Sequence, residues 1–250
     1  MYKKLFVTVA VVLFAFSATA ADLTIDEIIN NIQANQTKIH DMYAETTTTI
    51  TSNMVMPGQE SKGPQKMVQK SKTWTKGQDK SKIEMLSPTR QITITNGDQM
   101  AIINPETGQK MVQDLKKLRE KSGGLGAGSQ MSLDKAKDFF YLSVRKLDSS
   151  TSGGIDTYII AGVPKKENKF MGKMEFYVDS EKWLPAKIIM YDPKNRPMSQ
   201  TEIEYQQISD VWVPITTTSS LTTPMGTMKM GMEYSNTKVN QGIKDSEFNI

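Results

Sequence analysis

An alternation of apolar and polar residues with a period of two runs through most of the chain, and it constrains the fold more than any other feature. The second half shows it most clearly, in apolar rows at 170–178, 184–190, 201–205, 211–215 and 228–234. Turn sequences such as Asn96-Gly97-Asp98 and Asp192-Pro193-Lys194-Asn195 separate the rows at hairpin intervals. One apolar and one polar face per strand is typical of an antiparallel sheet with one buried side.

The first half shows the same period in extended segments at 42–56, 67–75, 80–86, 91–95, 99–103 and 109–113. Together the segments amount to about eleven to thirteen strands, and a sheet of that size must curl, split or close. We therefore predict a mainly β fold with some α, built on a strongly curved antiparallel sheet. This sheet would form an unclosed β-barrel of about eleven strands.

Two segments break the period of two and predict helices. Thr24 and Glu27 form a capping box ahead of isoleucines at helical spacing, which predicts a helix over 24–40. In mid-chain, a short charged helical stretch at 114–121 precedes a glycine-rich hinge and a second helix that Ser132 caps. We expect the first helix to cover the sheet and the insert to form a helical lid. The hinge residues are Gly123, Gly124, Gly126 and Gly128, and the lid residues are Leu133, Phe139 and Phe140.

The first 20 residues have the three parts of a secretory signal peptide. Lys3 and Lys4 precede an apolar run at 5–16, and Ala18-Thr19-Ala20 forms a small-residue cleavage site. The apolar run is shorter than the ~20 residues that span a bilayer. We therefore expect cleavage after residue 20 and a soluble, exported domain over 21–250, with the periplasm as its location.

Composition argues against catalysis. The chain has no cysteine and one histidine, His40, which excludes disulfides, thiol nucleophiles and the usual zinc sites. His40 falls at the end of the predicted helix without a visible catalytic partner, and no pair of carboxylates stands out by its spacing. Lysines and acids are interspersed and arginines are few, which does not fit a nucleic-acid interface. We predict a protein that is not an enzyme and has no metal site or cofactor.

So few helices cannot cover the whole apolar face of a long sheet, so we expect an apolar cavity that holds a ligand. Its predicted wall consists of Ile159, Met174, Phe176, Ile188, Ile203, Val213, Met228, Met230 and Met232.

Methionine is abundant, with 17 in the chain and the densest run at 225–232. Thioethers are soft ligands that select Cu(I), so a copper site is one interpretation. Ordinary packing is another. The period of two places Met228, Met230 and Met232 on one strand face, where flexible thioethers adapt to ligands of irregular shape. We favour the lining of a lipid cavity, and copper binding stays open.

The hairpin at 94–109, Ile-Thr-Asn-Gly-Asp-Gln-Met-Ala-Ile-Ile-Asn-Pro-Glu-Thr-Gly-Gln, resembles one in the LolA/LolB-like family of periplasmic lipoprotein carriers. The segments 24–29 and 240–248 support the resemblance. It implies an unclosed β-barrel with a helical lid and a cavity that binds acyl chains. Where the family has an arginine that latches the lid, this chain has Lys76, and it lacks the cysteine that anchors the acceptor branch. We therefore expect a relative within the superfamily rather than the housekeeping carrier.

The predicted function is a periplasmic carrier or chaperone with a single LolA-like domain. It would bind acyl chains of lipids or lipoproteins for transfer toward the outer membrane, with an inner- or outer-membrane protein as donor or acceptor. The alternative is an envelope-stress sensor or scaffold module that uses the same fold to dock a membrane protein.

Overall fold

The computed structural model describes residues 23–55, 63–117, 133–147, 156–168 and 171–250. The described strands form one antiparallel sheet of thirteen. The first six are β1 (Asp41–Ser52), β2 (Gln65–Lys76), β3 (Lys80–Ser87), β4 (Gln91–Asn96), β5 (Gln99–Ile103) and β6 (Lys110–Asp114). The others are β7 (Phe140–Leu147), β8 (Thr157–Pro164), β9 (Lys173–Asp179), β10 (Leu184–Tyr191), β11 (Pro197–Ile208), β12 (Val211–Thr223) and β13 (Gly226–Val239).

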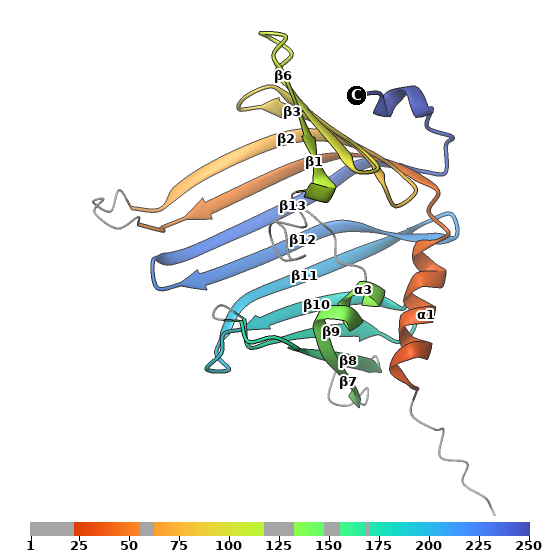
Figure 1. Ribbon diagram of the computed structural model, residues 1–250, viewed down its shortest axis with the longest axis vertical. Coiled ribbons are helices and arrows are strands. Elements are labelled where there is room, and N and C mark those ends of the chain that lie inside the picture. The colour runs from red at the N-terminus through yellow and green to blue at the C-terminus, as the bar shows by residue number, and fades with distance from the viewer. Residues whose placement is uncertain (1–22, 56–62, 118–132, 148–155, 169–170) are drawn as a thin grey trace, which may run out of the picture.

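The sheet consists of two meanders that meet at its centre. Strands β1 to β6 form one meander and β7 to β13 the other, and β1 pairs with β13 to join them. The two edge strands are β6 and β7, which lie at opposite ends of the sheet. They do not pair with each other in the described part of the chain, so the sheet stays unclosed (Figure 1). The predicted mainly β architecture with one large antiparallel unclosed sheet is confirmed.

Strand β7 and the helix before it correct one predicted boundary. The sequence suggested that the second helix would continue through Phe140. Instead, α3 (Leu133–Phe139) ends one residue earlier, and Phe140 begins β7. The backbone N–H of Lys165 donates to the carbonyl of Phe139 (2.8 Å), and Phe140 pairs with Pro164. Strand pairing with β8 therefore ends the helix.

The first helix, α1 (Ile25–Gln36), has the predicted capping box. The Glu27 N–H donates to Thr24 Oγ1 (3.3 Å), and the Thr24 N–H donates to Glu27 Oε2 (2.8 Å). The helix ends four residues before the predicted position 40, because β1 begins at Asp41. Ile28 and Ile32 pack with Tyr158, Ile160 and Val178 of the sheet in one buried cluster. The apolar stripe of α1 therefore covers β8 and β9.

The C-terminal segment is fastened to β2, β3 and β4. A short 3₁₀ helix, η1 (Asp245–Phe248), contacts β3 and β4, and its Phe248 is fully buried. Lys82 pairs with Glu247 (2.7 Å), and Lys76 pairs with Asp245 (2.9 Å). Lys76 Nζ also donates to the Ile243 carbonyl (2.8 Å). Lys76 therefore holds the C-terminal segment.

Some predictions fall outside the described residues. These are the signal peptide at 1–20 and the hinge at Gly123, Gly124, Gly126 and Gly128. Within the described ranges, no helix has the length and hydropathy needed to cross a membrane.

Candidate functional site

The face of the sheet against which α1 and α3 pack is called the inner face here. Residues paired directly across antiparallel strands lie on the same face. Ile160, which packs under α1, pairs with Phe176, and Phe176 pairs with Ile188. Leu142 pairs with Gly162, and Gly162 pairs with Met174. The register therefore places all of these residues on the inner face.

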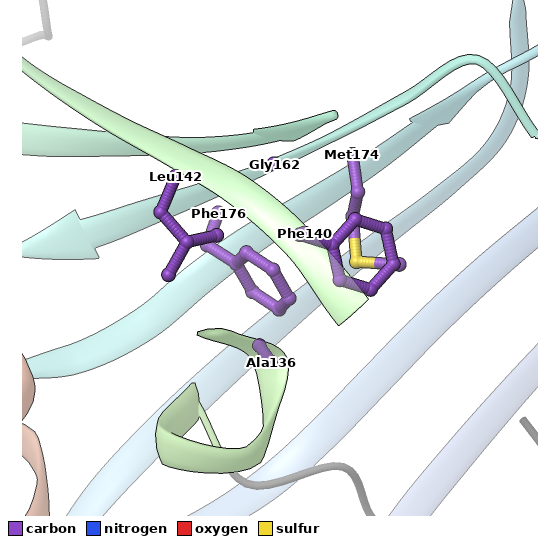
Figure 2. Close-up of a pocket in the computed structure, with 6 residues that line it drawn as sticks. All are labelled: Ala136, Phe140, Leu142, Gly162, Met174 and Phe176. Atoms are coloured by element: carbon purple, nitrogen blue, oxygen red, sulfur yellow. The ribbon is translucent and has the colours of Figure 1, made fainter. Parts of the chain in front are cut away.

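A small apolar pocket lies where α3 meets this face. Its lining is entirely apolar and consists of Ala136, Phe140, Leu142, Gly162, Met174 and Phe176. Figure 2 shows Ala136 of α3 facing the side chains that the strands contribute. The enclosed space is about 10 Å³, which is at the lower limit for one water molecule. The pocket is too small for an acyl chain while α3 lies on the sheet.

Three methionines of β13 lie in register on the inner face beyond this pocket. Met230 pairs with Ser219 of β12 on one side and with Ile50 of β1 on the other. Met228 and Met232 occupy the equivalent positions one pair away in each direction. Ile50 in turn pairs with Met67 of β2. We call Met228, Met230, Met232, Ile50 and Met67 the methionine row.

Apolar side chains continue from the methionine row to the edge of the sheet. Ala44 lies on the same face of β1 as Thr48, four residues earlier in the strand. It begins a line of successive cross-strand partners: Ala44, Thr73, Ile83, Thr93, Ile102 and Met111. Met67 is 41% exposed, Ile83 40% and Met111 51%. This half of the inner face therefore leaves apolar surface open to solvent.

The paired inner-face positions of β12, β13, β1 and β2 carry no charged side chain among the described residues. They hold threonine, serine, methionine, isoleucine, leucine, valine, glutamine, alanine, glycine and tyrosine. Charged residues such as Lys70, Lys229 and Glu233 occupy the alternate positions, which point to the outer face. An uncharged strip with exposed apolar groups suits an apolar ligand.

The polar groups of the inner face have partners. Tyr205 donates to the Pro185 carbonyl (3.0 Å), and its burial, with a smaller contribution from Tyr234, raises the pKa of its hydroxyl. Tyr234 donates to Met232 Sδ (3.1 Å). Within the described part of the chain, no buried side-chain nitrogen or oxygen lacks a hydrogen bond. Nor does any group of three or more His, Cys, Asp or Glu side chains there form a metal-binding cluster.

Seven of the nine predicted wall residues share the inner face: Met174, Phe176, Ile188, Ile203, Met228, Met230 and Met232. Ile159 pairs with Tyr177 and lies on the opposite face, so the prediction of its face is wrong, and Ile160 takes the inner position. Strand β8 is buried on both faces there, so its sequence has no alternation to follow. Val213 belongs to a separate cluster with Val211 and Val239.

The predicted lid residues are divided between two elements. Phe139 ends α3 and packs against the cluster of Ala136, Phe140 and Met171, whereas Phe140 belongs to β7. Leu133 is the first residue of α3. Sequence reasoning did not single out Leu142, Gly162 or the exposed residues Met67, Ile83 and Met111. For Leu142, Met67, Ile83 and Met111, the alternation of apolar and polar residues in their strands was the available signal. Gly162 had no such signal, because its strand β8 is buried on both faces.

Glu175 supports the pocket strands from the outer face, because it lies between Met174 and Phe176 in β9. Its carboxylate accepts hydrogen bonds from Lys173 Nζ (3.0 Å), Tyr177 Oη (3.1 Å) and Tyr191 Oη (2.8 Å). Burial alone would raise the pKa of Glu175, but these donors outweigh burial and lower it below the usual 4.5. The ionised carboxylate therefore ties β9 to β10.

Acidification should remove this contribution. A carboxylate with a lowered pKa stabilises the fold above its unfolded-state pKa, and the stabilisation disappears as the pH falls through the folded-state value. Glu175→Gln should therefore lose stability at neutral pH and show a flatter decline below about pH 4.5. Urea denaturation across this range measures it, with Glu181→Gln on the exposed β9–β10 turn as control. Parallel acid limbs for wild type and Glu175→Gln would contradict the assignment.

Comparison with known proteins supports this description of the fold. A family model described only as "uncharacterized protein" matches residues 128–250. No curated protein matches the chain. Three solved structures are similar at TM-scores of 0.58–0.59.

The first of the three is a DUF1329 family protein from Desulfovibrio piger, with 18% identity and a TM-score of 0.59 over 90% of this chain and 97% of that chain. A LolA superfamily protein from Nitrosomonas europaea has 13% identity and a TM-score of 0.58 over 91% and 98%. A domain from Vibrio parahaemolyticus, described as an outer membrane lipoprotein-sorting protein, has 17% identity and a TM-score of 0.58 over 90% and 97%. The chain therefore has a LolA-like fold.

Proposed function

We propose that the protein is a periplasmic carrier that binds acyl chains of lipids or lipoproteins on its inner face and delivers them toward the outer membrane. The observation that carries this proposal is the uncharged strip from the methionine row to Met111, which leaves apolar side chains exposed. Each buried methylene contributes about 0.8 kcal/mol. A long acyl chain would gain on the order of 10 kcal/mol before the entropy of binding is subtracted.

The location rests on the predicted signal peptide and on similarity to proteins of the LolA type. The structurally similar domain from Vibrio parahaemolyticus is described as an outer membrane lipoprotein-sorting protein, which supports a role in carrying lipoproteins toward that membrane. Methionine suits a carrier that must also release its cargo, because its flexible side chain packs against many shapes without a rigid fit. The ligand is held by apolar contact, so no catalytic step is required.

Helix α3 is the proposed lid. It lies on the pocket through Ala136, and Lys137 forms an ion pair with Asp26 of α1. Both charged side chains are well exposed, so this contact contributes little to stability and separates easily. Lifting α3 would uncover Phe140 and Phe176 and extend the open strip over β7 to β9. The glycines at 123–128 would serve as the hinge.

Extraction of the purified mature protein tests the proposal. Mass spectrometry of the extract should find co-purifying lipid or an acylated peptide, and a fluorescent long-chain fatty acid should bind to delipidated protein. An empty extract together with no binding of the fatty acid would contradict the carrier function. Capture of one stoichiometric membrane protein without lipid would instead identify the sensor or scaffold.

Cross-linking α3 to α1 should slow ligand exchange. The chain has no cysteine, so Asp26→Cys with Lys137→Cys offers the only two thiols for a short bismaleimide linker. If α3 must lift, dissociation of the bound fluorescent fatty acid should slow about tenfold or more after cross-linking. The same double variant before cross-linking is the control. Unchanged dissociation would show that α3 is not a lid.

A further inference from the structure

The free edge of β6 has features of a pairing site, and the inference drawn from it does not rest on the proposed function. Strand β6 pairs only with β5 within the described sheet. Met111 and Val112 are each 51% exposed, with Met111 on the inner face and Val112 on the outer. Lys110 and Asp114 at its ends are also exposed. An exposed edge strand is a template for another strand.

The backbone bonds on either side of β6 show which residues have free hydrogen-bonding groups. The Asn104 N–H donates to the Gln109 carbonyl (2.9 Å), and the Leu115 N–H donates to the Asp98 carbonyl (2.8 Å). Bonding residues alternate along an antiparallel ladder, so positions 109, 111, 113 and 115 bond toward β5. The N–H and C=O groups of Lys110 and Val112 therefore point away from β5, as does the N–H of Asp114. Asp114 also precedes the helical residues 115–117, and its Oδ1 accepts a hydrogen bond from the Lys117 N–H (3.1 Å).

We propose that β6 pairs with β6 of a second copy of this chain, antiparallel about a two-fold axis at Val112. Lys110 then lies opposite Asp114 of the second copy, Val112 lies opposite its own equivalent, and Asp114 lies opposite Lys110. The central Val112 pair is of the hydrogen-bonded type, in which two residues exchange both backbone bonds, and the two flanking pairs lie in the same register. The free groups of the edge are thereby satisfied, and the two exposed valines cover each other.

Charge complementarity singles out a second copy as the partner. β6 has one cation at its start and one anion at its end, four residues apart. Two antiparallel copies match these charges in only one register, and that register also pairs the residues whose backbone groups point outward. A slip of two residues loses both Lys–Asp pairs. Lysine on an edge strand usually prevents pairing. Here Asp114 of the second copy neutralises it, because the exposed Lys117 lies 3.9 Å from the Asp114 carboxylate and is only a weak competitor for it.

A proline substitution tests the edge without breaking the fold. In sedimentation velocity over a concentration series, the wild-type protein should show a monomer–dimer equilibrium. Val112→Pro removes an N–H that points away from β5, a position where an edge strand tolerates proline. It should stay monomeric where the wild type is dimeric. Val112→Thr retains the N–H and is the matched control, so it should still dimerise. A wild-type protein that is monomeric throughout the series would overturn the proposal.

A charge exchange gives a second test that does not depend on proline. Lys110→Glu and Asp114→Lys each place two like-charged pairs across the axis, and each should raise the dimer Kd about tenfold. An equimolar mixture of the two variants should dimerise again, because both cross-axis pairs are then opposite in charge. A mixture that stays monomeric would overturn the proposed register. Binding of an extended peptide to β6 of a monomeric wild type would overturn the second copy as its partner.

Discussion

Met230→Lys is expected to weaken the binding of a long-chain fatty acid by about 2 kcal/mol, or about thirtyfold in Kd, with the fold intact. Met230 lies in the middle of the methionine row, between Ser219 and Ile50 on the neighbouring strands. A lysine there would be desolvated by any acyl chain that lies along the strip. In the unliganded protein the partly exposed position lets the ammonium reach water, so stability should change little.

Thr218→Lys is the matched control. Thr218 is exposed and pairs with Gly231, next to Met230, but on the outer face. Both substitutions add one lysine at nearly the same place in the sheet, and they differ only in the face on which the lysine lies. Titration with a fluorescent fatty acid should therefore give wild-type affinity for Thr218→Lys. Equal affinities for the two variants would show that the methionine row does not contact the ligand.

Ile28→Ala is expected to lower the free energy of unfolding by about 3 kcal/mol. Ile28 is fully buried between α1 and the sheet, in one cluster with Ile160 and Val178. Its truncation removes apolar contact and leaves a cavity that the sheet cannot close. Urea denaturation followed by circular dichroism measures the change. Asn30→Ala, on the exposed side of the same helix, should change stability by no more than about 0.5 kcal/mol. A loss under about 1 kcal/mol for Ile28→Ala would mean that α1 is not part of the core.

Short sequence motifs predicted those elements that begin or turn at a recognisable motif. The capping box located the start of α1, and the turn at Asn96-Gly97-Asp98 located the β4–β5 hairpin. Strand β7 was not recognised, because Phe140 also fits the apolar stripe of the preceding helix. The face of Ile159 could not be read because Tyr158, Ile159 and Ile160 are all buried. In such a strand the register with the neighbours decides the orientation, and the neighbours are distant in sequence.

The sequence predicted the apolar character of the candidate site, but not how far the site extends across the sheet. The alternation of Met228, Met230 and Met232 correctly indicated one face of one strand. The continuation of that surface to Met111 depends on six successive pairings from β13 to β6, and no local pattern encodes them. The role of Lys76 was likewise hidden, because its partners Ile243 and Asp245 lie about 170 residues further along the chain.

The pairing of β1 with β13 has a consequence for how the molecule assembles. It joins residues about 200 positions apart, whereas every other ladder connects consecutive strands. The two meanders can form from short-range contacts, but the central ladder must wait until the last strand has been made. Closing so long a loop is slow. Until β1 and β13 pair, they are two bare edges, so we expect the chain to be most prone to aggregate during this interval.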